Sequence, residues 1–479
     1  MSFSSRRRNY LLTPHRRDGL IEWMKSMLMH SFVLDALETS GGDTFSHFEL
    51  LIDEHRRLEA EGNGRPSRLK QLVPTVGTFH TRLPLRQAFE VYNEKYKLTK
   101  RKHIQISFNE IRHIMNLAQV MAMRKVCELK DVSTDGDAQV KDDAETTDCN
   151  DSVEEFNGPK MITFDGDQTL YTDGSNFDSN PRLANYLYEL VHSGVTVAVV
   201  TAAGYEYKAE KYEFRLSGLL NYFKSKNLTD DECHRFYLFG GECNYLLRLG
   251  NDFRLHPVRE AGPGGWVTGT KYIPDTPGNW SEEEIKALLD ASEIAVAESM
   301  NDQNLKGIVI RKKRSIGLAP QPGHVIPREA LDETVLRCQS KLSKMNQGSG
   351  SNLPFCAFNG GRDVWVDVGN KKVGVQVLGA YLGVDASDIL HIGDQFLNTG
   401  NDYAARSVCP CIWITSPEET TYILKRILKL AGVVYELDNE KEAANILLGK
   451  TASTVDFAEL DRRTTAVKEM DVFTGDFKN

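Results

Sequence analysis

Several features are missing from this sequence of 479 residues, and each absence excludes a class of protein. The sequence has no run of about eighteen apolar residues and no apolar segment behind its arginine-rich start, so we expect neither a membrane span nor secretion. The eight cysteines form no C-x-x-C pair, which removes the usual zinc and redox motifs. The net charge of -9 lacks the basic footprint of nucleic-acid-binding domains. We therefore expect a cytoplasmic protein that binds neither membrane nor nucleic acid.

The length of the chain predicts more than one domain. A single hydrophobic core stops growing at about 250 to 300 residues, and 479 residues exceed that size. Changes in composition divide the chain into a helical N-terminal region, an acidic linker, an α/β core in two pieces, and an insertion between those pieces. We place these parts at residues 1–130, 131–158, 159–204 with 368–479, and 205–367, respectively.

Short apolar segments alternate with helical ones in both pieces of the predicted core. This alternation is typical of an α/β fold with a parallel sheet. The expected strands lie at 161–164, 195–200, 389–392 and 411–414, and the first helix between them lies at 181–192. Ligands of such sheets bind beyond the carboxyl ends of the strands, so the residues that follow each strand are the candidates for chemistry.

Two aspartates directly after the first strand are the clearest catalytic candidates. Asp165 and Asp167 stand two residues apart, and Gly166 between them lets the backbone turn both carboxylates toward one site. Asp165 is placed to attack phosphorus and become an aspartyl-phosphate. Asp167 is placed to contact the phosphate, to protonate the leaving oxygen and later to deprotonate water. Because a D-x-D pattern is also common in surface turns, its weight depends on the other strand ends.

Two further strand ends supply groups that suit phosphate. Thr201 follows the second strand, and Lys371 and Lys372 begin a later helix. A hydroxyl and an ammonium group at these positions would hold the phosphoryl oxygens as charge develops. Lys371 is a candidate for this role, and the residues alone do not exclude the adjacent Lys372.

A third group of residues suits a divalent cation. Mg²⁺ prefers oxygen ligands and keeps several waters. Asp165, the backbone carbonyl of Asp167, and Asp394 after the strand at 389–392 would provide part of such a ligand set. Asp402 is a further expected ligand, either directly or through a water molecule.

The order of these residues resembles the four motifs of the haloacid dehalogenase superfamily. The sequence has D-x-D-x-T after one strand, Thr201 after the next, Lys371 before a helix, and Gly-Asp after another strand. The resemblance implies a Mg²⁺-dependent phosphohydrolase in which 205–367, between the second and third motifs, is an α/β cap over the active site. The usual second acid after Gly-Asp is replaced by Asn398, and Asp402 comes later, as in the phosphomannomutase branch.

Segments across nearly the whole chain resemble one family more closely. They are 6–10, 16–18, 72–80 and 165–174. Together they are similar to the IMP-specific 5′-nucleotidases of fungi and some protists. The resemblance implies hydrolysis of inosine monophosphate (IMP) to inosine and phosphate, dependence on Mg²⁺, a cytosolic homo-oligomer that we expect to be a tetramer, and activation by ATP through the helical region.

Other residues have both a functional and a purely structural interpretation. For Asp173 the two interpretations are a contact with a ribose hydroxyl, which the resemblance favours, and a plain turn residue. Asp367, at the return from the insertion, contacts the substrate or belongs to a plain hairpin. The basic run at 311–314 steers an anionic substrate or is a solvated face. The same choice applies to the predicted effector site for ATP, which consists of Lys100, Arg101, Lys102 and His103.

Two other functions compete with the nucleotidase hypothesis. A sugar phosphomutase or phosphatase of the same superfamily shares D-x-D and a similar Gly-Asn-Asp segment at 400–402. A mutase has to exclude water and would release phosphate slowly. A non-catalytic nucleotide-sensing regulator would keep the fold without the chemistry, but the intact set of Asp165, Asp167, Thr201, Lys371 and Asp394 argues against this.

Overall fold

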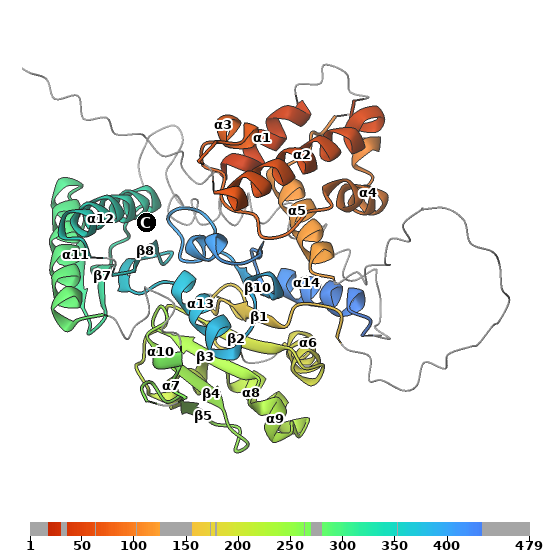
Figure 1. The fold of residues 1–479 in the computed structure, drawn as a ribbon. Coiled ribbons are helices and arrows are strands. Elements are labelled where there is room, and N and C mark those ends of the chain that lie inside the picture. Colours follow the sequence, from red (N-terminus) through yellow and green to blue (C-terminus); the bar gives the residue numbers. More distant parts are fainter. Residues whose placement is uncertain are drawn as a thin grey trace, which may run out of the picture.

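A computed structural model gives the fold in three parts: N-terminal helices, a central mostly parallel sheet with helices on both faces, and a separate small sheet with two long helices (Figure 1). It describes residues 18–29, 36–62, 64–101, 103–124, 156–172, 174–177, 180–262, 264–269, 280–351 and 353–433. This architecture confirms the predicted α/β class with N-terminal helices. No helix in these ranges is long and apolar enough to cross a membrane.

The N-terminal helices pack around an apolar core of their own. A capping box begins the last of them, because Ser107 and Glu110 satisfy each other's backbone N–H groups. That last helix also contacts the central sheet near Trp413. The helices are α1 (Gly19–Met29), α2 (Ala36–Glu61), α3 (Arg68–Leu72), α4 (Leu85–Tyr96), the short η1 (Leu98–Lys100) and α5 (Phe108–Ala122).

The central sheet has seven strands in the order β11-β10-β1-β2-β3-β4-β5. The five from β11 to β3 are parallel, and β4 and β5 add to the edge in antiparallel fashion. The chain builds β1, β2 and β3 outward in one direction and later adds β10 and β11 on the other side of β1. The strands are β1 (Met161–Phe164), β2 (Thr196–Val200), β3 (Phe236–Gly240), β4 (Tyr245–Leu249), β5 (Leu255–Pro257), β10 (Ile389–Gly393) and β11 (Cys411–Trp413).

Helices cover both faces of this sheet. Strand residues alternate between two apolar clusters, with Ile162 and Phe164 in one and Met161 in the other. The first cluster includes α6 (Pro181–His192), α8 (Ser217–Ser225) and α14 (Pro417–Leu430), and the second includes α10 (Trp266–Gly269) and α13 (Lys371–Leu382). Four short elements complete this part: α7 (Ala209–Arg215), α9 (Asp230–Cys233), η3 (Ala386–Asp388) and η4 (Tyr403–Ser407).

The separate sheet is antiparallel, in the order β6-β7-β9-β8, and packs against α11 and α12. We expected the insertion to begin at residue 205, and this boundary is wrong. Strands β3 to β5 continue the central sheet because β3 is apolar along its whole length and pairs with β2. The elements of the separate part are α11 (Glu282–Asp302), β6 (Gly307–Arg311), β7 (Ser315–Pro320), α12 (Arg328–Ser349), β8 (Phe355–Asn359) and β9 (Val364–Val368).

Candidate active site

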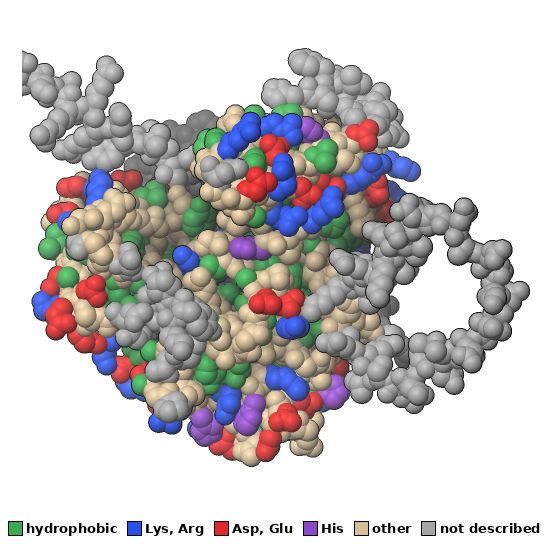
Figure 2. Space-filling view, in the orientation of Figure 1, with side chains coloured by type: hydrophobic (Ala, Val, Ile, Leu, Met, Phe, Trp, Pro, Cys, Tyr) green, Lys and Arg blue, Asp and Glu red, His purple; other side chains and the backbone are tan. Residues whose placement is uncertain are grey.

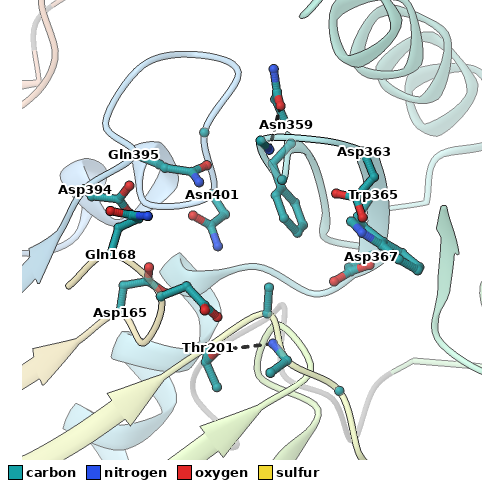
Figure 3. Close-up of a pocket in the computed structure, with 18 of the residues that line it drawn as sticks. Asp165, Gln168, Thr201, Asn359, Asp363, Trp365, Asp367, Asp394, Gln395 and Asn401 are labelled. Carbon is teal, nitrogen blue, oxygen red and sulfur yellow. Dashed lines mark hydrogen bonds between the residues drawn. The ribbon is translucent and has the colours of Figure 1, made fainter. Parts of the chain in front are cut away.

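The predicted catalytic residues meet where the strand order of the central sheet reverses. Strand β1 lies between β10 and β2, and the crevice at such a reversal is where open α/β sheets bind ligands. Asp165 follows β1 and Asp394 follows β10, so both lie at the carboxyl edge of the sheet (Figure 3). The backbone N–H of Asp165 donates to the carbonyl of Ile392 at 2.9 Å, which fixes the start of the D-x-D turn against β10.

A buried lysine connects two of the acids. Lys371 is the first residue of α13, whose N-terminus is capped by the Asn370 side chain. Its fully buried Nζ lies 2.6 Å from Asp165 Oδ1 and 2.6 Å from Asp402 Oδ1. Burial alone would lower the pKa of this lysine, but the charges of Asp165 and Asp402 outweigh burial and raise it. Lys371 is therefore a fixed cation beneath Asp165, whereas the adjacent Lys372 is half-buried.

The two acids that share Lys371 differ in their environments. Burial raises the pKa of Asp165 to about 7, against the opposing charge of Lys371. Asp402 is equally buried, yet Lys371 and a hydrogen bond from His391 bring its pKa below the ordinary value. Asp402 also receives the backbone N–H of Gln395 at 2.8 Å. Asp402 is thus held as an anion by three neighbours.

Three carboxylates form a cluster that suits a hard metal ion. One oxygen from each of Asp165, Asp394 and Asp402 lies within 4.8 Å of the others. Oxygen donors at this spacing fit Mg²⁺. Asp402 differs from the other two because Lys371 and His391 both contact its Oδ1. This favours a role for Asp402 in holding Lys371 rather than in direct coordination.

Thr201 and Asp167 face the same space from the neighbouring segments. Thr201 is buried after β2, and its Oγ1 accepts the backbone N–H of Ala203 at 3.1 Å, so the hydroxyl hydrogen remains available to a ligand. Asp167 Oδ1 accepts the backbone N–H of Gly174 at 3.1 Å and the guanidinium of Arg215 at 2.6 Å. Nothing in the sequence pattern had indicated Arg215.

A cavity of about 920 Å³ lies over these groups, between the central sheet and the separate one. In Figure 3, Asp165 and Thr201 lie on one side of it, and Asn359, Trp365 and Asp367 lie on the other. Lys312 Nζ lies 3.9 Å from the centroid of the Trp365 ring, and Gly317 lies so close to this ring that a Cβ there would approach it to 2.6 Å. Trp365 packs against Lys312 and Gly317 and forms part of the wall of the cavity.

Two buried polar residues near Lys371 were missed by sequence reasoning. Glu242 has φ 51°, a left-handed conformation, in the turn after β3, and burial raises its pKa to about 7 while Lys371 opposes this. Its Oε1 accepts from Asn401 Nδ2 at 3.0 Å. Asn401 Oδ1 is buried without a hydrogen-bond partner in the described ranges, and the residue lines the cavity. A single acid in a glycine-rich turn gives no periodic signal that could have found Glu242.

The remaining predicted site residues are Asp173 and the four residues of the effector cluster. Asp173 and Lys102 lie outside the described residues. Lys100 and His103 are exposed, and Arg101 pairs with Glu110 at 2.6 Å. Basic and acidic side chains are interspersed over the N-terminal helices on the face in Figure 2. The predicted effector cluster does not line the cavity over Asp165.

The N-terminal helices are joined to the active site by a chain of polar contacts. Arg112 on α5, 1% exposed, donates to both carboxylate oxygens of Glu419 at 2.9 and 2.8 Å. Asn116, one turn further along α5, donates to the backbone carbonyl of Trp413 at 2.6 Å. The indole N–H of Trp413 donates to the backbone carbonyl of Asp394 at 2.8 Å. Two hydrogen bonds therefore separate α5 from a candidate metal ligand.

A buried aspartate and lysine at the reversal of a parallel sheet, further carboxylates beside them and an overlying cavity are features expected of a phosphoryl-transfer enzyme. The family model described as IMP-specific 5′-nucleotidase matches residues 2–424 of the chain. The IMP-specific 5′-nucleotidase of Yarrowia lipolytica is 35% identical over 440 residues, which cover 88% of this chain and 96% of that protein.

Solved structures of a protozoan relative agree with this match. An IMP-bound mutant of Plasmodium falciparum IMP-nucleotidase gives a TM-score of 0.71 at 34% identity, covering 86% of this chain and 94% of that one. The ATP-bound structure of the same protein gives 0.67 at 34% identity, covering 86% and 85%. The chain belongs to the IMP-specific 5′-nucleotidase family and is a phosphomonoesterase.

Proposed function

We propose that the chain hydrolyses IMP to inosine and phosphate, with Asp165 as the nucleophile. The observation that carries this proposal is the position of Asp165 beneath the cavity, 2.6 Å from the buried cation Lys371. The motif order of haloacid dehalogenase-like phosphatases and the membership of the family support the same assignment. The substrate itself follows from the family and not from the geometry.

The protein groups divide the reaction into two displacements. In the first, a carboxylate oxygen of Asp165 bonds to phosphorus, the bond to the 5′ oxygen breaks, and Asp167 gives its proton to that oxygen. In the second, Asp167 removes a proton from water as the water oxygen attacks the aspartyl-phosphate, which releases phosphate and restores Asp165. The Thr201 hydroxyl and Lys371 Nζ donate to phosphoryl oxygens as charge develops on them.

The donor set supports Mg²⁺ as the cofactor. Asp165, the backbone carbonyl of Asp167, and Asp394 are the proposed ligands, since the carboxylate oxygens of Asp165 and Asp394 approach closely. Bound Mg²⁺ would neutralise charge where an anionic nucleophile meets an anionic phosphate. Asp402 contacts Lys371 and so helps to hold it against Asp165.

We assign the separate sheet with α11 and α12 as the cap that closes the cavity over the nucleotide. Asp367, at the end of β9, supports this assignment. It is 6% exposed, lines the cavity, and its Oδ1 has no hydrogen-bond partner among the described residues. Burial also raises the pKa of Asp367 well above the ordinary value. A hydroxyl or ring N–H of the substrate would satisfy this oxygen. Asp173 is proposed to contact a ribose hydroxyl.

We further propose that ATP activates the enzyme through the N-terminal helices and that the chain forms a homo-oligomer. A relative has been solved with ATP bound. The contacts from Asn116 through Trp413 to Asp394 offer a route by which a shift of α5 would reach the metal site. Activation requires that ATP bind one conformational state better than another. Light scattering tests the assembly, and IMP saturation curves with and without ATP test the activation.

Phosphate release from a panel of substrates tests the main proposal. Purified protein with Mg²⁺ is incubated with IMP, other purine nucleotides and hexose phosphates, and free phosphate is measured. We expect release from IMP in preference to the others and none from Asp165→Asn, because an amide is neither a competent nucleophile nor a good metal ligand. Wild-type protein that releases no phosphate from any purine nucleotide would contradict the proposal.

The alternatives predict different results in the same assay. A phosphomutase would interconvert hexose phosphates with little free phosphate. A nucleotide-sensing regulator would bind nucleotide, hydrolyse none of the panel, and trap no aspartyl-phosphate mimic. Turnover of IMP by the wild type and its loss in Asp165→Asn excludes both.

A further inference from the structure

Arg215 is the residue that contacts the proposed acid-base group most closely. It ends α7, the helix that follows the loop after β2, and its Nη2 lies 2.6 Å from Asp167 Oδ1. The side chain of Arg215 is 16% exposed, and that of Asp167 is 34% exposed. The contact is therefore partly shielded from water, which distinguishes it from a surface ion pair.

An aromatic ring holds the guanidinium in place. Arg215 Cζ lies 4.9 Å from the centroid of the buried Tyr171 ring. The hydroxyl of Tyr171 lies so close to Gly166 that a Cβ there would approach it to 2.5 Å. Tyr171 thus packs beneath the D-x-D turn while Arg215 lies over its ring, and a cation on an aromatic face gains further attraction. Tyr171 therefore holds Arg215, and Arg215 in turn holds Asp167 through Oδ1.

The two oxygens of Asp167 have different surroundings. Oδ1 accepts from both Arg215 and the backbone N–H of Gly174. Oδ2 accepts no hydrogen bond from the residues that the structure describes. An oxygen that already has two donors is a poor position for a further proton, so the geometry leaves Oδ2 to carry it. Asp167 lines the cavity, and so does Arg215.

We propose that Arg215 is the positioning residue for general acid and base catalysis by Asp167. It holds Oδ1 so that the proton on Oδ2 passes to the 5′ oxygen when the bond from that oxygen to phosphorus breaks. In the second displacement, Oδ2 takes the proton of the attacking water. This inference rests on the proposed function, because it assigns Asp167 the acid-base role in that reaction.

The leaving group gives a test that separates positioning from structure. An alkoxide leaving group needs a proton, whereas a thiolate, with a pKa near that of a cysteine, leaves without one. The analogue of IMP with sulfur in place of the bridging 5′ oxygen keeps the base, the ribose and the phosphate. Thiol release from this analogue in a single turnover reports only the first displacement. Phosphate release from IMP depends on Asp167 in both displacements.

We expect Arg215→Ala to lower kcat/KM for IMP by about 10²-fold, within the range of general acid-base contributions. Thiol release from the sulfur analogue should change by less than about threefold. Arg215→Lys should restore part of the loss on IMP, and Asp167→Asn should show the same selectivity as Arg215→Ala. The matched control is Lys211→Ala, which removes a positive charge from the same helix at an exposed position.

Equal losses on the oxygen and sulfur substrates in Arg215→Ala would overturn the positioning role, because loss of structure or of phosphate binding affects both. A loss in Lys211→Ala as large as that in Arg215→Ala would also overturn it. Failure of the wild type to hydrolyse IMP would instead contradict the proposed function. In that case, the Arg215→Ala comparison would be repeated with a phosphate ester that the wild type does hydrolyse and with the analogue of that ester that has sulfur in place of the bridging oxygen.

Discussion

Replacing Lys371 by methionine removes the cation at the centre of the site while keeping a side chain of similar length. Lys371 is completely buried and contacts the carboxylates of Asp165 and Asp402, each at 2.6 Å. Its loss would leave two buried acids without this partner. Glu242, whose charge also acts on Lys371, lies nearby. The expected effect is therefore large for a single substitution.

The magnitude follows from the cost of an uncompensated buried charge. Breaking a buried ion pair by removing one partner typically costs about 3–5 kcal/mol. Although Lys371 has two acidic partners, the cost should lie in that range and should not double. Asp165 can take up a proton, and His391 and Gln395 still contact Asp402. A loss of this size is a large fraction of the roughly 5–15 kcal/mol that stabilises a typical folded protein.

Urea unfolding in chelator and in excess Mg²⁺ measures this loss. Lys372→Met is the control, because Lys372 is the adjacent residue, is half-buried, and forms no ion pair in the described part of the chain. We expect the control to change the free energy of unfolding by less than about 0.5 kcal/mol. Mg²⁺ should stabilise Lys371→Met more than it stabilises the wild type, because a divalent cation would replace the missing charge.

The reasoning would be refuted if Lys371→Met were as stable as Lys372→Met in chelator. A second comparison adds Asp402→Asn to Lys371→Met. Since this removes one of the two acids left without Lys371, the double variant should be more stable than the sum of the single effects predicts. Additive effects would mean that Lys371 and Asp402 do not interact as their distance indicates.

Four further results are expected. Burial raises the pKa of Glu242 from 4.5 to about 7, so the folded state binds the extra proton, and stability falls as pH rises through that interval. Relative to Glu242→Gln, the wild type should lose about 3 kcal/mol between these pH values in urea unfolding. For Glu419 the shift has the opposite sign. Burial alone would raise the pKa of Glu419, but the charge of Arg112 outweighs burial and lowers it. Glu419→Gln should cost about 3–5 kcal/mol at pH 7, and calorimetry should show the difference shrinking below about pH 4. Asp394→Asn should raise the Mg²⁺ concentration that gives half-maximal phosphate release. Replacing Lys100 and Lys102 by methionine should abolish activation by ATP and spare basal hydrolysis, and unchanged activation would remove these residues from the effector site.

The grouping of the candidate catalytic side chains was predictable because one rule of sheet geometry places them. Asp165, Thr201 and Asp394 each follow an apolar strand, and parallel strands bring their carboxyl ends to one edge. The structure also distinguishes Lys371 from Lys372, which the sequence could not do. Adjacent residues at a helix start point in different directions, and only Lys371 faces the buried acids.

Glu242 and Arg215 were not predictable by the same reasoning. Glu242 is buried, and its hydrogen-bond partner Asn401 is 159 residues away in the sequence. Arg215 is one charged residue among several in a short helix, and only its distance to Asp167 distinguishes it. The boundary at residue 205 failed for a different reason. The apolar run at 236–239 is as continuous as β1, but its sequence does not say which sheet it joins, and only its pairing with β2 places it in the central sheet.

The arrangement of charge explains why a metal ion should be needed even though a lysine is already in place. Lys371 contacts Asp165 and Asp402, so its single charge is offset before a substrate arrives. Asp394 adds a further carboxylate to the same cluster. A phosphate monoester would therefore meet a net negative surface at the nucleophile. Bound Mg²⁺ would reverse that balance, while Lys371 keeps Asp165 oriented. We therefore expect Lys371→Met to impair catalysis even at Mg²⁺ concentrations that restore its stability.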